Sequence, residues 1–228
     1  MPQIAINLTT TMKKRILFLM LAFVCTIMLQ AQEVKIDEEL KSLVDVVVSL
    51  RAADSAKKDA AIKAATAALS KDLKWTLMDE LVDKNGGECI LNKKMKRFQL
   101  SNIQNHIFSE KYGKNYSKGV FLNGEDSRFN YSLIEKGIKA KGKVRYTFKG
   151  RAGQQDFVVV PCDSKTNLNV RLLKGKDSLK PSVVKDKDGI LYLHSNAGLK
   201  TTDEITLEIE NKTNVNIAVV VLNHNTRK

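Results

Sequence analysis

The feature that most constrains the fold of this chain is a hydrophobic period of two residues in its C-terminal part. The longest clean alternation runs from Ile138 to Phe148, with an apolar or small residue at every second position. Four of the five positions between them hold a cation: Lys139, Lys141, Lys143 and Arg145. Alternation of this kind is typical of a β-strand with one buried and one exposed face. The pattern predicts one strand whose polar face carries cations about 7 Å apart.

Further stretches of the C-terminal part are predicted to be short strands separated by turns. They are Phe129 to Leu133, Phe157 to Val160, Leu168 to Leu173, Val183 to Val184, Ile190 to Leu193, Ile205 to Ile209 and Ile217 to Leu222. Lys187-Asp188-Gly189 and Asn211 to Asn214 are typical turn sequences between them. About eight short strands in roughly one hundred residues predict an antiparallel β-sandwich over 129–228, of jelly-roll or immunoglobulin-like type.

The residues before this region have a helical period instead. Over 32–87, hydrophobic residues recur at spacings of three and four in stretches that begin near Leu40, Ser55 and Leu73. Asn85-Gly86-Gly87 ends the last of them. We expect a small helical bundle or one long, broken helix there, and a mixed connector over 88–128. The predicted fold class is α+β, with an N-terminal helical region followed by the sandwich.

Residues 1–31 are predicted to be a signal peptide whose translation start is Met12. Lys13, Lys14 and Arg15 form a basic segment, Ile16 to Leu29 is apolar, and Ala31 offers a cleavage site. A bilayer span needs about 20 apolar residues, so a cleaved signal is favoured over a permanent membrane span. We therefore expect an exported bacterial protein that is periplasmic, on the cell surface or secreted.

The charge of the chain predicts an anionic partner. The formal net charge is +13, and removal of 1–31, which hold three cations and no acid, leaves +10. Six cations in and after the alternating strand are predicted to bind anions: Lys139, Lys141, Lys143, Arg145, Lys149 and Arg151. An anionic glycan or another envelope component is the expected partner, a protein partner remains open, and nucleic acid is not expected. The competing interpretation is that these cations serve solubility and protect a sheet edge.

Cysteine usage leaves two alternatives open. Cleavage after Ala31 leaves Cys89 and Cys162, which either form a disulfide in an oxidising compartment or are two buried free thiols. Because there is no Cys-x-x-Cys, the usual signatures of redox catalysis and of structural zinc are missing. Cys89 and His106 are the one candidate pair of nucleophile and base, but no recognisable motif surrounds Cys89.

No cofactor or metal site is predicted. Asp186 and Asp188 before Gly189 begin like a calcium loop, but the following residues are apolar, so a hairpin turn is the better interpretation. His194 and His224 lack the spacing of metal ligands and are expected to be polar residues at the surface or at strand ends.

Two runs in the sandwich region resemble a known type of module. "YTFKGRAGQQDFVVVPCD" (146–163) and "DEITLEIENKTNVNIAVVVLNHN" (203–225) resemble the accessory β-sandwiches of secreted bacterial enzymes, of the pre-peptidase C-terminal kind. The resemblance covers less than half of the chain and implies a noncatalytic module that helps secretion, stability or surface binding. The leading hypothesis is an exported noncatalytic binding or structural module. The alternative is a hydrolase of unrecognised family, with a site between the helical region and the sandwich.

Overall fold

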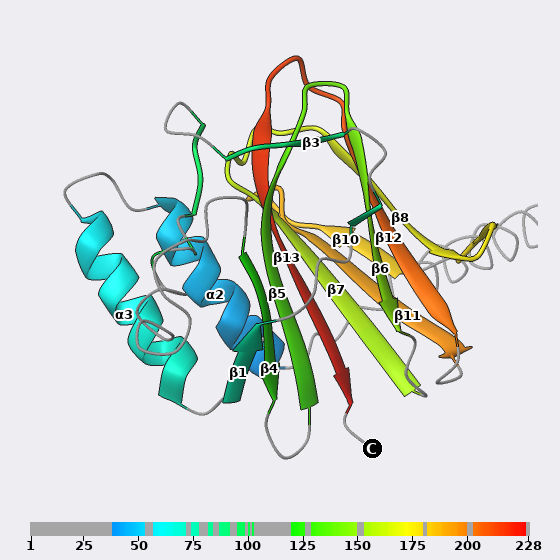
Figure 1. Ribbon diagram of the computed structural model, residues 1–228, viewed down its shortest axis with the longest axis horizontal. Helices are drawn as coiled ribbons and strands as arrows, with labels where there is room; N and C mark the ends of the chain where they lie inside the picture. The colour runs from blue at the N-terminus through cyan, green and yellow to red at the C-terminus, as the bar shows by residue number, and fades with distance from the viewer. Residues whose placement is uncertain are drawn as a thin grey trace, which may run out of the picture. The chain divides into compact units, whose positions relative to one another are not determined.

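A computed structural model describes most of the chain after residue 37. The described residues are 38–52, 57–71, 74–77, 82–83, 87–91, 95–98, 100, 102, 120–125, 129–149, 153–179, 182–199 and 203–226. They all belong to one compact unit. Two helices, α2 (Glu38–Ala52) and α3 (Lys58–Lys71), precede the main strands (Figure 1).

The strands form two antiparallel sheets. The larger one has the order β1-β4-β5-β13-β7-β11-β10, and β3 also pairs with β5. Its strands are β1 (Lys74–Leu77), β3 (Glu88–Cys89), β4 (Val120–Glu125), β5 (Phe129–Ile138), β7 (Gly153–Pro161), β10 (Ser182–Lys185), β11 (Leu191–Leu199) and β13 (Ile217–Thr226). The smaller sheet has the order β2-β6-β12-β8-β9. Its strands are β2 (Val82–Asp83), β6 (Lys143–Lys149), β8 (Leu168–Lys174), β9 (Asp177–Ser178) and β12 (Glu204–Asn211).

One hydrophobic core lies between the two sheets. Phe157 and Val221 from the larger sheet share a buried cluster with Tyr146 and Leu207 from the smaller one, and all four side chains are fully buried. The rings of Phe148 and Phe157 meet edge to face across this core, with centroids 5.1 Å apart. Two facing antiparallel sheets with two helices confirm the predicted α+β class and the β-sandwich.

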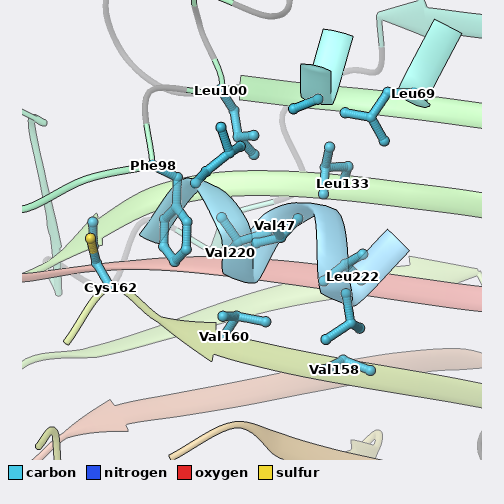
Figure 2. Close-up of a cluster of buried hydrophobic side chains, with 14 of the residues drawn as sticks. Val47, Leu69, Phe98, Leu100, Leu133, Val158, Val160, Cys162, Val220 and Leu222 are labelled. Carbon is cyan, nitrogen blue, oxygen red and sulfur yellow. The ribbon is translucent and has the colours of Figure 1, made fainter. Parts of the chain in front are cut away.

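A second hydrophobic core lies between the helices and the outer face of the larger sheet. Figure 2 shows Val47 of α2 and Leu69 of α3 in one cluster with Leu133, Val158 and Val220 of the strands. Strands β7 and β13 are therefore covered on both faces, which explains their continuous apolar runs, FVVV over 157–160 and IAVVVL over 217–222. The helices share this core with the sheet.

The predicted helix near Leu73 is wrong. Residues 74–77 are strand β1, which pairs in register from Lys74 opposite Glu125 to Leu77 opposite Leu122 of β4. Trp75 and Thr76 favour strands, and the backbone hydrogen bonds to β4 outweigh a short helical pattern. Because β4 itself lies within the predicted connector, the larger sheet begins before residue 129.

The predicted single strand from Ile138 to Phe148 is also wrong, because the chain turns at residues 139–142. β5 ends at Ile138 in the larger sheet, and β6 begins at Lys143 in the smaller one. Gly142 N donates to Lys139 O at 2.9 Å, and Lys141 has a φ of 55°. The alternation itself is confirmed along β6, where Val144, Tyr146 and Phe148 are buried. The other predicted strands are each present.

Candidate functional site

An open pocket of about 630 Å³ lies where chain connections meet at one end of the sandwich. We call this region the loop end and define it as the turn 139–142 and the segments 162–167 and 211–216. The lining residues are apolar (Met95, Cys162, Val215, Ile217), neutral and polar (Thr166, Thr213, Asn216) or charged (Lys96, Asp163, Lys165). The volume is within the range of roughly 300 to 1,000 Å³ that is typical of small-molecule sites.

Hydrogen bonds hold the loop end in place. The Asn211 side chain is fully buried, donates to the carbonyls of Lys139 at 3.0 Å and Val215 at 2.8 Å, and accepts from Thr213 N at 2.9 Å. Ala140 N donates to Asn216 Oδ1 at 3.0 Å, which ties the turn to the same segment. These bonds fix the backbone of 139–142 and 211–216 relative to each other.

The loop end carries an excess of positive charge. Its exposed lysines are Lys139, Lys141, Lys165 and Lys212, and the exposed Lys96 lies beside it. The acidic residues are Asp163 in the loop end and Glu210 next to it. A hydrogen bond from Lys165 N, followed by one from Lys96 Nζ at 3.2 Å, lowers the pKa of Asp163. Asp163 is therefore ionised at neutral pH and neutralises Lys96. Lys212 Nζ lies 3.8 Å from Glu210 Oε2, so among the described residues Lys139, Lys141 and Lys165 are the lysines of the loop end without an acidic partner.

The predicted anion-binding residues do not form one row. Lys139 and Lys141 lie in the turn at the loop end, and Lys141 Nζ donates to Lys212 O at 2.7 Å. Lys143 and Arg145 lie on β6, where both pair with Glu208 of β12. Lys149 ends β6, and Arg151 lies outside the described residues. The predicted ladder is thus divided between the loop end and the outer face of the smaller sheet.

Glu208 is the centre of that outer face. The strand register aligns Arg145 of β6, Glu208 of β12 and Arg171 of β8 in one row. The Glu208 side chain is 1% exposed, Arg145 Nε donates to it at 2.9 Å, Arg171 binds its other oxygen, and Lys143 Nζ lies 3.4 Å away. Burial by itself raises the pKa of Glu208, but the arginine hydrogen bonds and the Lys143 charge outweigh burial and lower it. Lys143 and Arg145 of β6 are therefore already paired with an acid.

The two cysteines are free thiols, Cys89 on β3 and Cys162 directly after the end of β7. Cys89 of β3 is opposite Gly137 of β5, Gly137 is opposite Ala218 of β13, and Cys162 N donates to Ala218 O at 2.9 Å. The cysteines are thus three strand spacings apart, roughly 14 Å, whereas a disulfide needs Cα atoms within about 7 Å. In the structure both thiols are free, but only Cys162 is buried, whereas Cys89 is partly exposed. The proposed base His106 lies outside the described residues.

Neither thiol is activated for nucleophilic chemistry. Burial raises the pKa of Cys162 to about 12, and the charge of Glu135 acts in the same direction. Burial also raises the pKa of Cys89. A nucleophilic cysteine needs the opposite shift, because the thiolate is the reactive form.

We predict that both thiols react with Ellman's reagent immediately after denaturation without a reductant, whereas Cys162 is protected in the native protein at pH 8. A Cys162→Ser variant identifies the protected thiol. In this variant, the numbers of reactive thiols before and after denaturation should agree more closely than in the wild-type chain. If thiols were detected only after reduction, the separation of Cys89 on β3 from Cys162 after β7 would be contradicted.

Sequence reasoning missed a row of polar residues on the helix-facing side of the larger sheet. Asp156 of β7 is the register partner of both His194 of β11 and His224 of β13. His194 Nδ1 lies 2.5 Å from Asp156 Oδ1, and His224 Nδ1 lies 3.7 Å from Oδ2. A carboxylate that orients an imidazole in this way is also found in general-base catalysis. However, Asp156 is six residues along the strand from Cys162, roughly 20 Å from the pocket.

No three histidine, cysteine or acidic side chains are grouped as metal ligands in the part of the chain that the structure describes. Among the same residues, no helix is both long and apolar enough to cross a bilayer.

The turn at Asp186 is the predicted hairpin turn, since its Oδ1 accepts from Asp188 N and Ile190 N, and Gly189 has a φ of 78°.

Comparisons with known proteins identify no family. No protein-family model matches the chain, and no curated protein matches it. Among solved structures, a cupin domain from Bordetella pertussis has 14% identity and a TM-score of 0.24, covering 48% of this chain and 94% of that one. A sugar phosphate isomerase of the cupin superfamily from Silicibacter pomeroyi has 14% identity and a TM-score of 0.21, covering 66% and 76%. TM-scores this low carry no argument about function.

Proposed function

We propose that this chain is an exported, noncatalytic binding module that holds an anionic partner at the loop end. The observation that carries the proposal is a pocket beside an excess of lysine. Lys139 and Lys141 stay in the proposed site, whereas Lys143 and Arg145 lie outside it on β6, where both pair with Glu208. An anionic glycan or another component of the cell envelope is the partner class that fits this charge.

Sequence features support the exported and noncatalytic parts of the proposal. Residues 12–32 have the layout of a cleaved signal, which directs the protein to the periplasm, the cell surface or the medium. The resemblance of 146–163 and 203–225 to accessory sandwiches of secreted bacterial enzymes implies a noncatalytic role. The raised pKa values of Cys89 and Cys162 argue in the same direction, because they leave the hydrolase alternative without an activated thiol.

We also propose that the sandwich is a jelly-roll and not an immunoglobulin-like fold. The order β5-β13-β7-β11 lies opposite β6-β12-β8-β9, and consecutive strands from β5 to β8 alternate between the two sheets. Two interleaved Greek keys produce such an alternation. In this arrangement the turns 139–142, 162–167 and 211–216 gather at one end, where loops on a rigid scaffold commonly bind ligands.

The test is retention of the exported chain on immobilised polygalacturonate, a carboxylated glycan, as the salt concentration rises. We expect Lys139→Glu combined with Lys165→Glu to elute at clearly lower salt than the wild-type chain. Both side chains are exposed, so the fold should tolerate the changes. Each reversal replaces an attraction to the polymer by a repulsion, and this effect is screened as salt increases.

The matched control is Lys63→Glu combined with Lys176→Glu. These lysines are also exposed, on α3 and in the turn after β8, and the double variant has the same net charge as the test variant. We expect it to elute close to the wild-type chain. Equal losses in the two double variants would mean that retention depends on net charge alone, and the proposed site would be rejected.

A further inference from the structure

We infer that the anionic partner of the loop end also carries an apolar group, and that the pocket binds a single-chain amphiphile with an anionic head. This inference rests on the proposed function and adds the chemical class of the ligand. It depends on three features of the pocket: its apolar wall, its lysine and its buried hydroxyl.

The apolar wall is formed by Met95, Cys162, Val215 and Ile217. Val215 is 63% exposed, and it and Ile90 are the exposed large hydrophobic residues of the described part of the chain. This exposure is built into the fold, because Val215 O accepts from Asn211 Nδ2 at 2.8 Å and from Thr213 Oγ1 at 3.1 Å. An exposed apolar side chain held at the wall of a pocket is expected to gain from covering by an apolar ligand group.

The polar side of the pocket favours an anionic head. Lys165 and Lys96 both line the pocket. Because Lys96 is paired with Asp163, Lys165 is the lining cation whose charge is available to a ligand. Thr166 also lines the pocket, and its hydroxyl is buried without a hydrogen-bond partner among the described residues. Buried hydroxyls are normally satisfied by protein, water or ligand. An amphiphile with its alkyl chain against Val215 and its anionic head near Lys165 would cover the apolar wall and pair with the free cation.

The experiment titrates the isotope-labelled exported chain with decanoate and, separately, with decyltrimethylammonium, both below the concentrations at which they form micelles. The two probes have the same alkyl chain and opposite head charge. We expect decanoate to shift the backbone amide resonances of 162–167 and 211–216, and we expect the cationic probe to bind about tenfold more weakly. Equal affinity for the two probes, or shifts confined to other segments, would overturn the inference.

Substitution of the apolar wall provides the second measurement. Val215→Ser should weaken decanoate binding about fivefold, because it removes part of the apolar surface that the chain would cover. Ile90→Ser is the matched control, since Ile90 is 66% exposed and does not line the pocket. It should leave decanoate affinity unchanged. Equal affinities of wild type and Val215→Ser would count against the pocket as the binding site.

Polygalacturonate has no apolar chain, so it separates this inference from the proposed function. If the polymer is retained through Lys139 and Lys165 while decanoate does not bind, the amphiphile inference fails and the proposed function stands. If decanoate binds as expected and the polymer is not retained, the glycan version of the proposed function fails and the pocket assignment stands. If neither binds, both are rejected.

Discussion

Replacing Glu208 with alanine should lower the free energy of unfolding by about 2 to 3 kcal/mol at neutral pH. The Glu208 carboxylate is 1% exposed and is surrounded by Arg145, Arg171 and Lys143. Without it, three cations on neighbouring strands repel one another and lose their hydrogen-bond acceptor. The arginine side chains are 39% and 49% exposed, so water screens part of this repulsion, and the loss is smaller than for a fully buried ion pair. Urea unfolding at pH 7 measures the loss.

The cost of removing Glu208 should also depend on pH. Because the folded protein lowers the pKa of this group, its contribution is fully present above the unfolded value of about 4.3. The contribution is lost as the pH falls through the lower, folded pKa. The difference between wild type and Glu208→Ala should therefore shrink when unfolding is repeated at pH 3.

Glu204→Ala is the matched control for this experiment. Glu204 lies on the same strand and is exposed, so its removal should change stability by no more than about 0.5 kcal/mol. If Glu208→Ala were as mild as Glu204→Ala at pH 7, the central role of the Glu208 carboxylate on this face would be contradicted.

Local patterns predicted the strands well because alternation is a property of the strand itself. Val144, Tyr146 and Phe148 are buried as the period of two requires. The same pattern could not show that the chain turns at 139–142, since the turn depends on which sheet each half joins. Strand β1 was missed for a similar reason, because its partner β4 lies nearly fifty residues later in the chain.

The site was only partly predictable, because its chemistry depends on strand register. The sequence pattern identified the cations of β6, but nothing local shows that Glu208, more than sixty residues later, lies opposite Arg145. The two histidines are thirty residues apart in the chain and lack metal-ligand spacing, yet both are aligned with Asp156. Alternation predicts which face a residue occupies. It does not predict which residue of another strand lies beside it. That prediction requires the register of the paired strands.

Glu135 should show a second large effect, because its carboxylate satisfies backbone groups inside the helix-facing core. The residue is 1% exposed on β5. Its Oε1 accepts from Phe98 N at 2.9 Å and its Oε2 accepts from Leu100 N at 2.7 Å, and both of these residues are fully buried. Glu135→Ala leaves two buried N–H groups without these acceptors, and each such loss costs about 1 to 3 kcal/mol. We expect a total loss of about 3 to 4 kcal/mol in urea unfolding at pH 7.

Glu135→Gln distinguishes the loss of acceptors from the loss of charge. The amide keeps one oxygen acceptor in nearly the same shape, so it should satisfy one of the two N–H groups and cost about half as much as alanine. Hydrogen exchange at the Phe98 and Leu100 amides should then be fast for both residues in the alanine variant and for one of them in the glutamine variant. If glutamine were as costly as alanine while one amide stayed protected, the negative charge of Glu135 would be the stabilising property. In that case the stabilisation by Glu135 would not come from its hydrogen bonds to the backbone of residues 98 and 100.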